Sequence, residues 1–161
     1  MKKILFVFAI VAGSFAANAQ GTASKTQFGG GVRAGITIGD FDDFYGAVIG
    51  AELQAEHFFS SNVSGTLHTG YFNFSGKDGV DGFGMIPVLA GIRYYPSTTF
   101  FIGGRLGLGI LTEGGEKTAF NYEPQIGFNG KKVQVALGYN ARPQDGFTLS
   151  HIGLSAIIKF N

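Results

Sequence analysis

The 161-residue sequence contains no cysteine, which excludes both a disulfide framework and a thiolate metal site. Charged residues are scarce as well, at 14% of the chain against roughly 25% in soluble domains. The 12 Lys and Arg residues nearly balance the 11 Asp and Glu residues, so the chain has no basic excess for a nucleic-acid partner. Because soluble proteins rarely have so little surface charge, this composition directs attention to a membrane.

Long hydrophobic runs are missing too. Beyond residue 19, no apolar run approaches the roughly 20 residues of a membrane-spanning helix. Glycine is abundant instead, since 27 glycines are more than twice the usual share of roughly 7%. If the protein enters a membrane, it therefore does so with strands.

The first residues have the features of a secretory signal peptide. Two lysines precede an apolar run over residues 4–11, and small residues follow up to Ala17 and Ala19. A basic start, a short apolar core and an Ala-x-Ala site are the three parts of such a peptide. We expect cleavage after Ala19, with a signal peptide over residues 1–19 and one barrel domain over residues 20–161. An N-terminal anchor helix is the alternative.

Residues 85–111 show a strand pattern most clearly. On either side of a turn at residues 96–99, apolar side chains occupy every second position. The apolar faces of the two arms carry Ile86, Val88, Ala90, Ile92, Tyr94 and Ile102, Leu106, Leu108, Ile110. The opposite faces carry Arg93, Arg105 and several glycines. A membrane barrel has this arrangement, because its apolar face meets lipid while glycines and a few charges fill the interior.

The same alternation predicts eight strands in the chain. We expect them at residues 27–39, 45–59, 63–74, 85–95, 100–111, 120–128, 131–140 and 147–160. A helix competes for residues 45–59, which are rich in helix formers, but polar residues fall there at every second position. The strand at residues 120–128 contains Pro124, which cannot donate a hydrogen bond to a neighbouring strand. Asn129-Gly130, which follows this strand, is a strong signal for a two-residue hairpin turn.

The connections between these strands are expected to alternate in length. Those after the second, fourth and sixth strands are short, and those after the others, including residues 141–146, are longer and carry most of the charge. Aromatic residues gather near strand ends and predict two girdles, with Phe74 and Tyr95 among their members. The predicted fold is an all-β, eight-stranded antiparallel up-and-down transmembrane β-barrel.

At this point the sequence resembles a known family. Residues 86–95, the turn, and the glycine-alternating strand up to Gly109 look like the central hairpin of small outer-membrane β-barrel proteins of Gram-negative envelopes, the group of OmpX, OmpW and the OmpA membrane domain. The resemblance implies an outer-membrane location, insertion by the barrel assembly machinery, contact with outer-membrane lipid and lipopolysaccharide, and a monomer without cofactor. One departure is that Asn161 follows Phe160, where such chains commonly end on an aromatic residue.

Strand parity predicts a cluster of charges inside the barrel. Its members are Arg33, Glu52, Glu56, Arg93, Arg105, Glu123 and Lys132, with Lys159 on the same side. The interior of an eight-stranded barrel is just wide enough for side chains to fill, so we expect these charges to pair and close it. A narrow gated pore is the alternative.

The expected loops carry an acidic excess. Asp40, Asp42 and Asp43 could hold a divalent cation, shared with lipopolysaccharide, through hard oxygen ligands. Their spacing matches no EF-hand, so the alternative is a solvated acidic rim. Arg142 is counted among the few loop cations.

No catalytic constellation emerges. Ser150 and His151 are neighbours in a strand and point to opposite faces, while Ser155 lies roughly 13 Å along the strand from His151. Lipid A deacylase barrels carry His and Ser two residues apart, where this chain has Gly153. We interpret His151 and His68 as inward, hydrogen-bonded histidines. The expected role is structural or surface-interactive without catalysis, against a small passive channel or an exported soluble barrel of lipocalin type.

Overall fold

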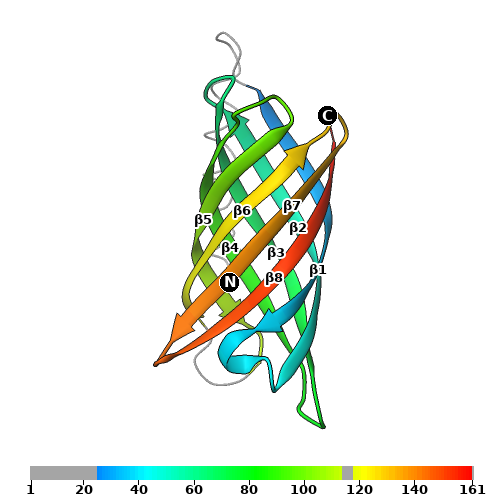
Figure 1. Cartoon of the computed structure of the whole chain (residues 1–161), viewed down its shortest axis with the longest axis vertical. Helices are drawn as coiled ribbons and strands as arrows, with labels where there is room; N and C mark the ends of the chain where they lie inside the picture. The colour runs from blue at the N-terminus through cyan, green and yellow to red at the C-terminus, as the bar shows by residue number, and fades with distance from the viewer. Residues whose placement is uncertain (1–24, 114–117, 161) are drawn as a thin grey trace, which may run out of the picture.

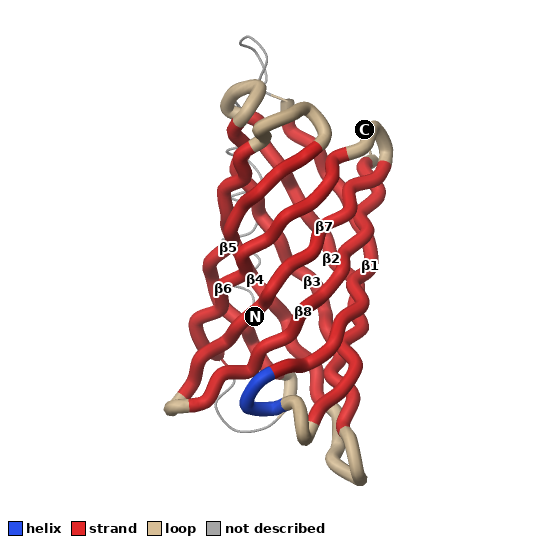
Figure 2. Tube along the Cα trace, in the orientation of Figure 1, coloured by secondary structure: helices blue, strands red, loops and turns tan. Residues whose placement is uncertain are grey.

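The computed structural model describes residues 25–113 and 118–160, which fold into eight strands and one short helical turn (Figures 1 and 2). The elements are β1 (Thr26–Ile38), η1 (Gly39–Phe41), β2 (Tyr45–Phe58), β3 (Val63–Gly76), β4 (Phe83–Tyr94), β5 (Phe100–Leu111), β6 (Thr118–Asn129), β7 (Val133–Gln144) and β8 (Phe147–Lys159). The segment over residues 45–59 for which a helix competed is a strand. None of the helices in this described part is long and apolar enough to cross a membrane.

The strands form a closed antiparallel barrel in chain order. Each strand pairs with its neighbour in sequence, and β1 closes the ring against β8, with Arg33 opposite Ser155 and Thr37 opposite His151. Closure leaves no open sheet edge, as a bilayer requires of a protein that crosses it with strands. The predicted fold class is confirmed.

The two ends of the barrel differ. At one end, here called the terminal end, β1 begins, β8 ends and residues 59–62, 95–99 and 130–132 connect strands. At the other, here called the loop end (Figure 1, lower end), η1 and residues 77–82 and 145–146 connect strands. The connections at this end carry Asp40, Asp42, Asp43, Asp78, Asp81 and Asp145. The loop end lies on the side opposite the C-terminus.

The outer surface is apolar and the interior is polar. Large hydrophobic side chains on alternate strand positions are exposed; Val32, Ile49, Ile92, Leu106, Leu154 and Ile158 are between 55% and 64% exposed. Their neighbours along the same strands, such as Arg33, Arg93 and Arg105, are at most 1% exposed. A protein with this surface needs an apolar solvent around it.

Two connections differ from the sequence prediction. Residues 141–144 belong to β7, so Arg142 is buried in the barrel mouth and not in a loop. The two-residue turn lies at Asp145-Gly146, where both φ angles are positive (49° and 85°), as this turn type demands. Asn129-Gly130 forms no such turn, because Asn129 pairs with Gln134 and residues 130–132 connect the strands. That register places Gln134 inside, where it bonds to Glu56.

The turn geometry predicts a difference between two glycines. A Cβ added at Gly146 or at Gly104 would meet nothing within 4 Å, but only Gly146 has a positive φ. We expect Gly146→Ala to lower the free energy of unfolding by about 1 kcal/mol, because an L-residue is strained there. Gly104→Ala, with the same added atom, is the control and should change stability little. Urea unfolding in lipid vesicles measures both, and equal effects would refute the turn argument.

Pro124 lies on the outer face of β6 and interrupts the ladder. The β6–β7 pairing runs from Gln125 opposite Gly138 towards the terminal end, and resumes only at Tyr122 opposite Ala141. The gap lies at Pro124 because proline has no N–H to donate to the ladder, as the sequence indicated. On its other side Pro124 pairs with Gly104 without interruption.

The interior is layered along the barrel axis. Near the loop end, Val48, Phe72, Phe74, Met85 and Leu149 form a buried apolar cluster. Near the terminal end, Tyr95, Phe101 and Ala136 form another, with Phe58 against it. Phe74 and Tyr95 were expected in the outer girdles, but both point inward, because they occupy the parity of the interior face. The polar layer between these two apolar clusters is the candidate site.

Candidate functional site

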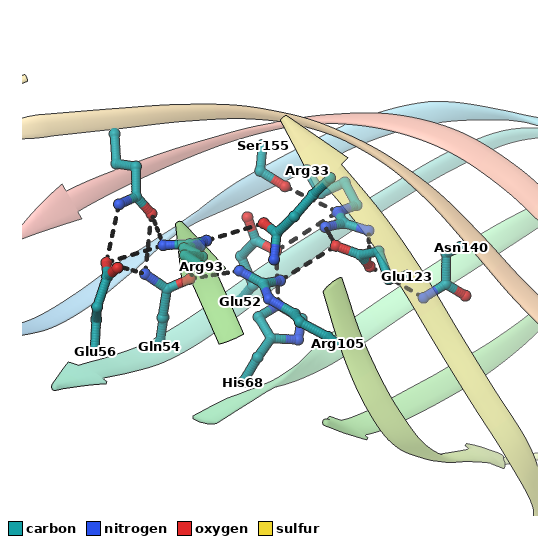
Figure 3. A network of polar contacts seen from close by, with 12 residues as sticks. Arg33, Glu52, Gln54, Glu56, His68, Arg93, Arg105, Glu123, Asn140 and Ser155 are labelled. Atoms are coloured by element: carbon teal, nitrogen blue, oxygen red, sulfur yellow. Dashed lines mark hydrogen bonds and ion pairs between the residues drawn. The ribbon is translucent and has the colours of Figure 1, made fainter. Parts of the chain in front are cut away.

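The centre of the lumen is built around Glu123 (Figure 3). Its carboxylate accepts two hydrogen bonds of 2.8 Å from Arg33 Nη1 and Nη2, a bidentate pair between β6 and β1. Arg105 Nη1 donates to the same carboxylate over 3.2 Å, and Asn140 Nδ2 over 3.0 Å. One carboxylate therefore holds two guanidinium groups, and all of these side chains are buried.

A second carboxylate completes this central group. Glu52 Oε2 lies 3.5 Å from Arg33 Nε and 2.8 Å from His68 Nε2. Arg33 Nε also donates to Ser155 Oγ over 2.9 Å. Residues from β1, β2, β3 and β8 thus meet across the lumen.

Glu56 organises the network nearer the terminal end. Arg93 Nη1 lies 2.9 Å from Glu56 Oε2, while the hydroxyls of Ser64 and Tyr95 each donate to Oε1 over 2.6 Å. Gln134 Nε2 donates to Oε2 over 3.1 Å. Gln54 Nε2 adds a longer contact of 3.5 Å to Oε2, so five donors compensate the charge of this buried carboxylate.

Glutamine side chains join the two groups. Gln54 Oε1 accepts from Arg93 Nη2 over 2.9 Å and also from Arg105. Gln125 Oε1 accepts from Arg93 Nη2 over 3.0 Å. The network is continuous, and its three arginines are balanced by three glutamates.

Aromatic rings from the apolar clusters cover both ends of this network. The Arg33 guanidinium lies 5.0 Å from the centre of the Phe72 ring, and that of Arg93 lies 4.2 Å from the Phe101 ring. Such cation–π contacts suit desolvated arginines. The network is thereby enclosed between aromatic residues along the axis.

Six of the seven residues predicted for the lumen cluster lie in this network. The seventh, Lys132, does not: it is exposed in the connection between β6 and β7. The prediction assumed that β7 begins at Lys131, but it begins at Val133, so strand parity does not apply to Lys132. Lys159 is half-buried at the terminal end, where its Nζ donates to Asn129 Oδ1 over 2.7 Å.

The two histidines differ from each other. His68 is hydrogen-bonded to Glu52, as expected. His151 is buried but neither ring nitrogen has a hydrogen-bond partner among the described residues. It packs edge-on against Phe72 and Phe74, at ring distances of 5.9 and 5.4 Å, so its ring makes aromatic contacts in place of the expected hydrogen bonds.

The geometry offers no catalytic pair among these residues. Ser155 Oγ is bound to Arg33, and Ser150 Oγ lies 3.1 Å from the Tyr139 hydroxyl. A serine nucleophile needs a base within hydrogen-bond reach, whereas Ser155 contacts an arginine and Ser150 a tyrosine.

Several members of the network were not singled out from sequence. Gln54, Ser64, Tyr95, Gln125, Gln134 and Asn140 are neutral, and sequence reasoning considered only charges. Parity could have found all six, since each lies at the parity of the interior face. Tyr95 follows the end of β4 but keeps the inward parity of Arg93.

The acidic residues of the first loop are exposed at the loop end. Asp40 Oδ2 accepts the N–H of Thr148 over 2.7 Å, and the carbonyl of Asp42 accepts from Lys77 Nζ over 2.6 Å. Asp43 is exposed beside them. In the described part of the chain, no group of three His, Cys, Asp or Glu residues is arranged to hold a metal ion.

Fold and site together define a closed, eight-stranded transmembrane barrel filled with ion pairs. Among solved structures it is similar to Ail, the attachment invasion locus protein of Yersinia pestis, in complex with the heparin analogue sucrose octasulfate (16% identity, TM-score 0.62, 86% of this chain and 100% of that chain covered). Ail in a phospholipid bilayer nanodisc is similar too (17%, 0.56, 84% and 100%).

Neisserial surface protein A, NspA, shares the same architecture (13% identity, TM-score 0.60, 85% of this chain and 97% of that chain). No family model matches the chain, and no curated protein does. At these identities the likeness establishes the fold. The chain is a small eight-stranded barrel of the outer-membrane type that resembles Ail and NspA, as its sequence predicts.

Proposed function

We propose that this protein is exported with cleavage after Ala19, resides in the outer membrane as a sealed, non-catalytic barrel, and presents its loop end to the exterior. The supporting observation is the layered interior: an ion-pair network with three arginines and three glutamates lies between two apolar clusters. Such a core stabilises a barrel and leaves no aqueous path.

The orientation follows from the usual arrangement of such barrels. Even-stranded outer-membrane barrels keep their short turns inside the periplasm and their longer loops outside. Here the six-residue connections 39–44 and 77–82 lie at the loop end. Insertion in this orientation is the task of the barrel assembly machinery, and the apolar outer surface would contact lipid and lipopolysaccharide.

The soluble lipocalin-type alternative conflicts with the exposure pattern. A soluble barrel would place polar residues outward and apolar residues inward. Here Leu106 and Ile158 are outward and Arg105 is inward. Cell fractionation tests the proposal: the mature protein should be found in detergent-extracted outer membrane, with heat-modifiable mobility on gels and Gln20 as its first residue. Recovery in the periplasmic wash would contradict it.

The charge of the loop end does not suit the kind of ligand with which Ail was solved. That ligand, sucrose octasulfate, is a polyanion. The described loop end of this chain carries seven acids, Asp40, Asp42, Asp43, Asp78, Asp81, Glu113 and Asp145, against Lys77 and the buried Arg142. A polyanion would be repelled there, so we propose a different kind of ligand for this end.

The channel alternative is tested by conductance. We expect the wild-type protein in planar bilayers to stay at baseline current, because an ion would have to enter both apolar clusters and break the ion pairs between them. Brief insertion noise in protein-free detergent controls sets the background. Sustained, voltage-stable openings above that background would overturn the sealed lumen.

A further inference from the structure

The loop end contains a cavity of about 490 Å³ that the ion-pair network does not use. It lies at the barrel mouth, next to the apolar cluster that contains Val48, Phe72 and Leu149. Cavities of several hundred Å³ are the usual size for small-molecule sites. Its walls and rim differ in chemistry, and this difference indicates what it would bind.

Aromatic rings form the walls. Phe41, from η1, lies 6.4 Å from Tyr45 and 6.2 Å from Phe147 between ring centres. Tyr45 meets Phe83 edge-on at 4.8 Å. All four side chains line the cavity: Phe41 belongs to η1, while Tyr45, Phe83 and Phe147 are the first residues of β2, β4 and β8. Rings in this arrangement present π faces and edges to a bound group.

Three carboxylates lie at the rim. Asp81, Glu113 and Asp145 line the cavity and are exposed, each on a different connection or strand end. Among the described residues, none of these three carboxylates has a cationic partner within 4.0 Å. The rim therefore attracts a positive charge.

The floor of the cavity is formed by buried side chains. Leu149 and Arg142 are buried there, and Arg142 Nε donates to the carbonyl of Gly109 over 3.3 Å. An apolar body would fit between the rings above Leu149, while the carboxylates at the rim attract a positive charge. Charge and shape together assign one orientation, with the apolar part inward and the positive group outward.

We propose that this mouth cavity binds small amphipathic organic cations, in which an ammonium group is carried on an apolar or aromatic body. The ammonium interacts with the rim carboxylates and the ring faces, and the body fills the space between Phe41, Tyr45, Phe83 and Phe147. The proposal extends the surface role above, yet purified protein tests it without reference to orientation in a cell or to conductance.

The test uses three probes that share a phenyl ring and a short chain but differ in charge: phenethylammonium, 2-phenylethanol and 3-phenylpropionate. The mature protein is refolded into phosphatidylcholine nanodiscs, so that no detergent competes, and amide signals are followed by ¹⁵N NMR. We expect phenethylammonium to shift the signals around Gly82 and Asp145, with a dissociation constant about tenfold lower than that of the alcohol. The anion should bind most weakly.

Two variants separate charge from shape. Asp81→Asn combined with Glu113→Gln and Asp145→Asn should reduce the advantage of the cation over the alcohol to less than about twofold, while the alcohol still binds. Phe147→Ala removes a wall and should weaken both probes. Phe44→Ala, which removes another exposed loop-end ring outside the cavity, is the matched control and should change neither. Heat-modifiable mobility confirms that each variant is folded.

Other results would overturn the proposal. Equal affinity for the three probes, a preference that survives the triple substitution, or no shift at the cavity would each contradict a cation site. Methylammonium, which lacks the apolar body, should leave the signals unchanged at the same concentration. If it shifts them as strongly as phenethylammonium, the carboxylates act as bulk surface charge and the cavity is no binding site.

Discussion

Replacing Glu123 by glutamine is expected to destabilise the barrel by about 3–5 kcal/mol, the usual cost of breaking a buried ion pair from one side. Glu123 is 1% exposed and holds Arg33 through two hydrogen bonds and Arg105 through a third. Glutamine has the same shape but no charge and adds a donor where only an acceptor fits. The guanidinium groups of Arg33 and Arg105 would then lack the negative charge that they share in the middle of the barrel.

The measurement is urea unfolding of the protein in lipid vesicles, read from the fraction with heat-modifiable mobility. Glu113→Gln, at an exposed position of the loop end, is the matched control and should change stability by less than about 0.5 kcal/mol. If Glu123→Gln fails to fold at all, a milder substitution at the edge of the network, Ser155→Ala, still removes one bond to Arg33 and should cost about 1 kcal/mol. Equal stability of the Glu123 and Glu113 variants would mean that the network does not support the fold.

The second large effect is expected on the outer surface. Leu106 is 59% exposed and points outward from the middle of β5, next to the inward Arg105. Arginine at this position should lower stability by about 2–4 kcal/mol, as cations do on the lipid face near the bilayer midplane. The same substitution on a water-soluble barrel would be close to neutral. The prediction therefore distinguishes a lipid-facing surface from a solvated one.

Val80→Arg provides the comparison, because Val80 is 38% exposed in the connection between β3 and β4. We expect it to leave stability almost unchanged, since its environment at the loop end is aqueous. Both variants are compared with wild type in vesicles by the same unfolding assay. A Leu106→Arg barrel as stable as Val80→Arg would show that the apolar belt does not face lipid.

Much of the fold could be predicted from the sequence because strand parity is a local property. Side chains alternate between the two faces of a strand with a period of two residues. This alternation alone places Arg93 and Arg105 on one face of their strands. Ile92 and Leu106 then lie on the other face, whatever the rest of the chain does. Once several strands show apolar outward faces, lipid is the only solvent that suits them. The same reasoning identified six of the seven lumen charges.

Local reasoning failed where a residue lies at or beyond a strand end. Lys132 was counted as inward because β7 was expected to start early, and Arg142 was placed in a loop because β7 was expected to stop early. Asp145-Gly146 is as strong a hairpin signal as Asn129-Gly130, but pairing across the ring decides which of them forms a two-residue turn. Parity also shows that His151 is inward without showing which side chains surround it.

The sequence by itself determined the strand count, the apolar exterior and the set of charges that had to be buried, because those follow from alternation and composition within each segment. Only the closed ring decided that Arg33 pairs with Glu123 from 90 positions away, and that four rings and three carboxylates surround one cavity at the loop end. These contacts depend on register and shear around the whole barrel, which no single strand specifies.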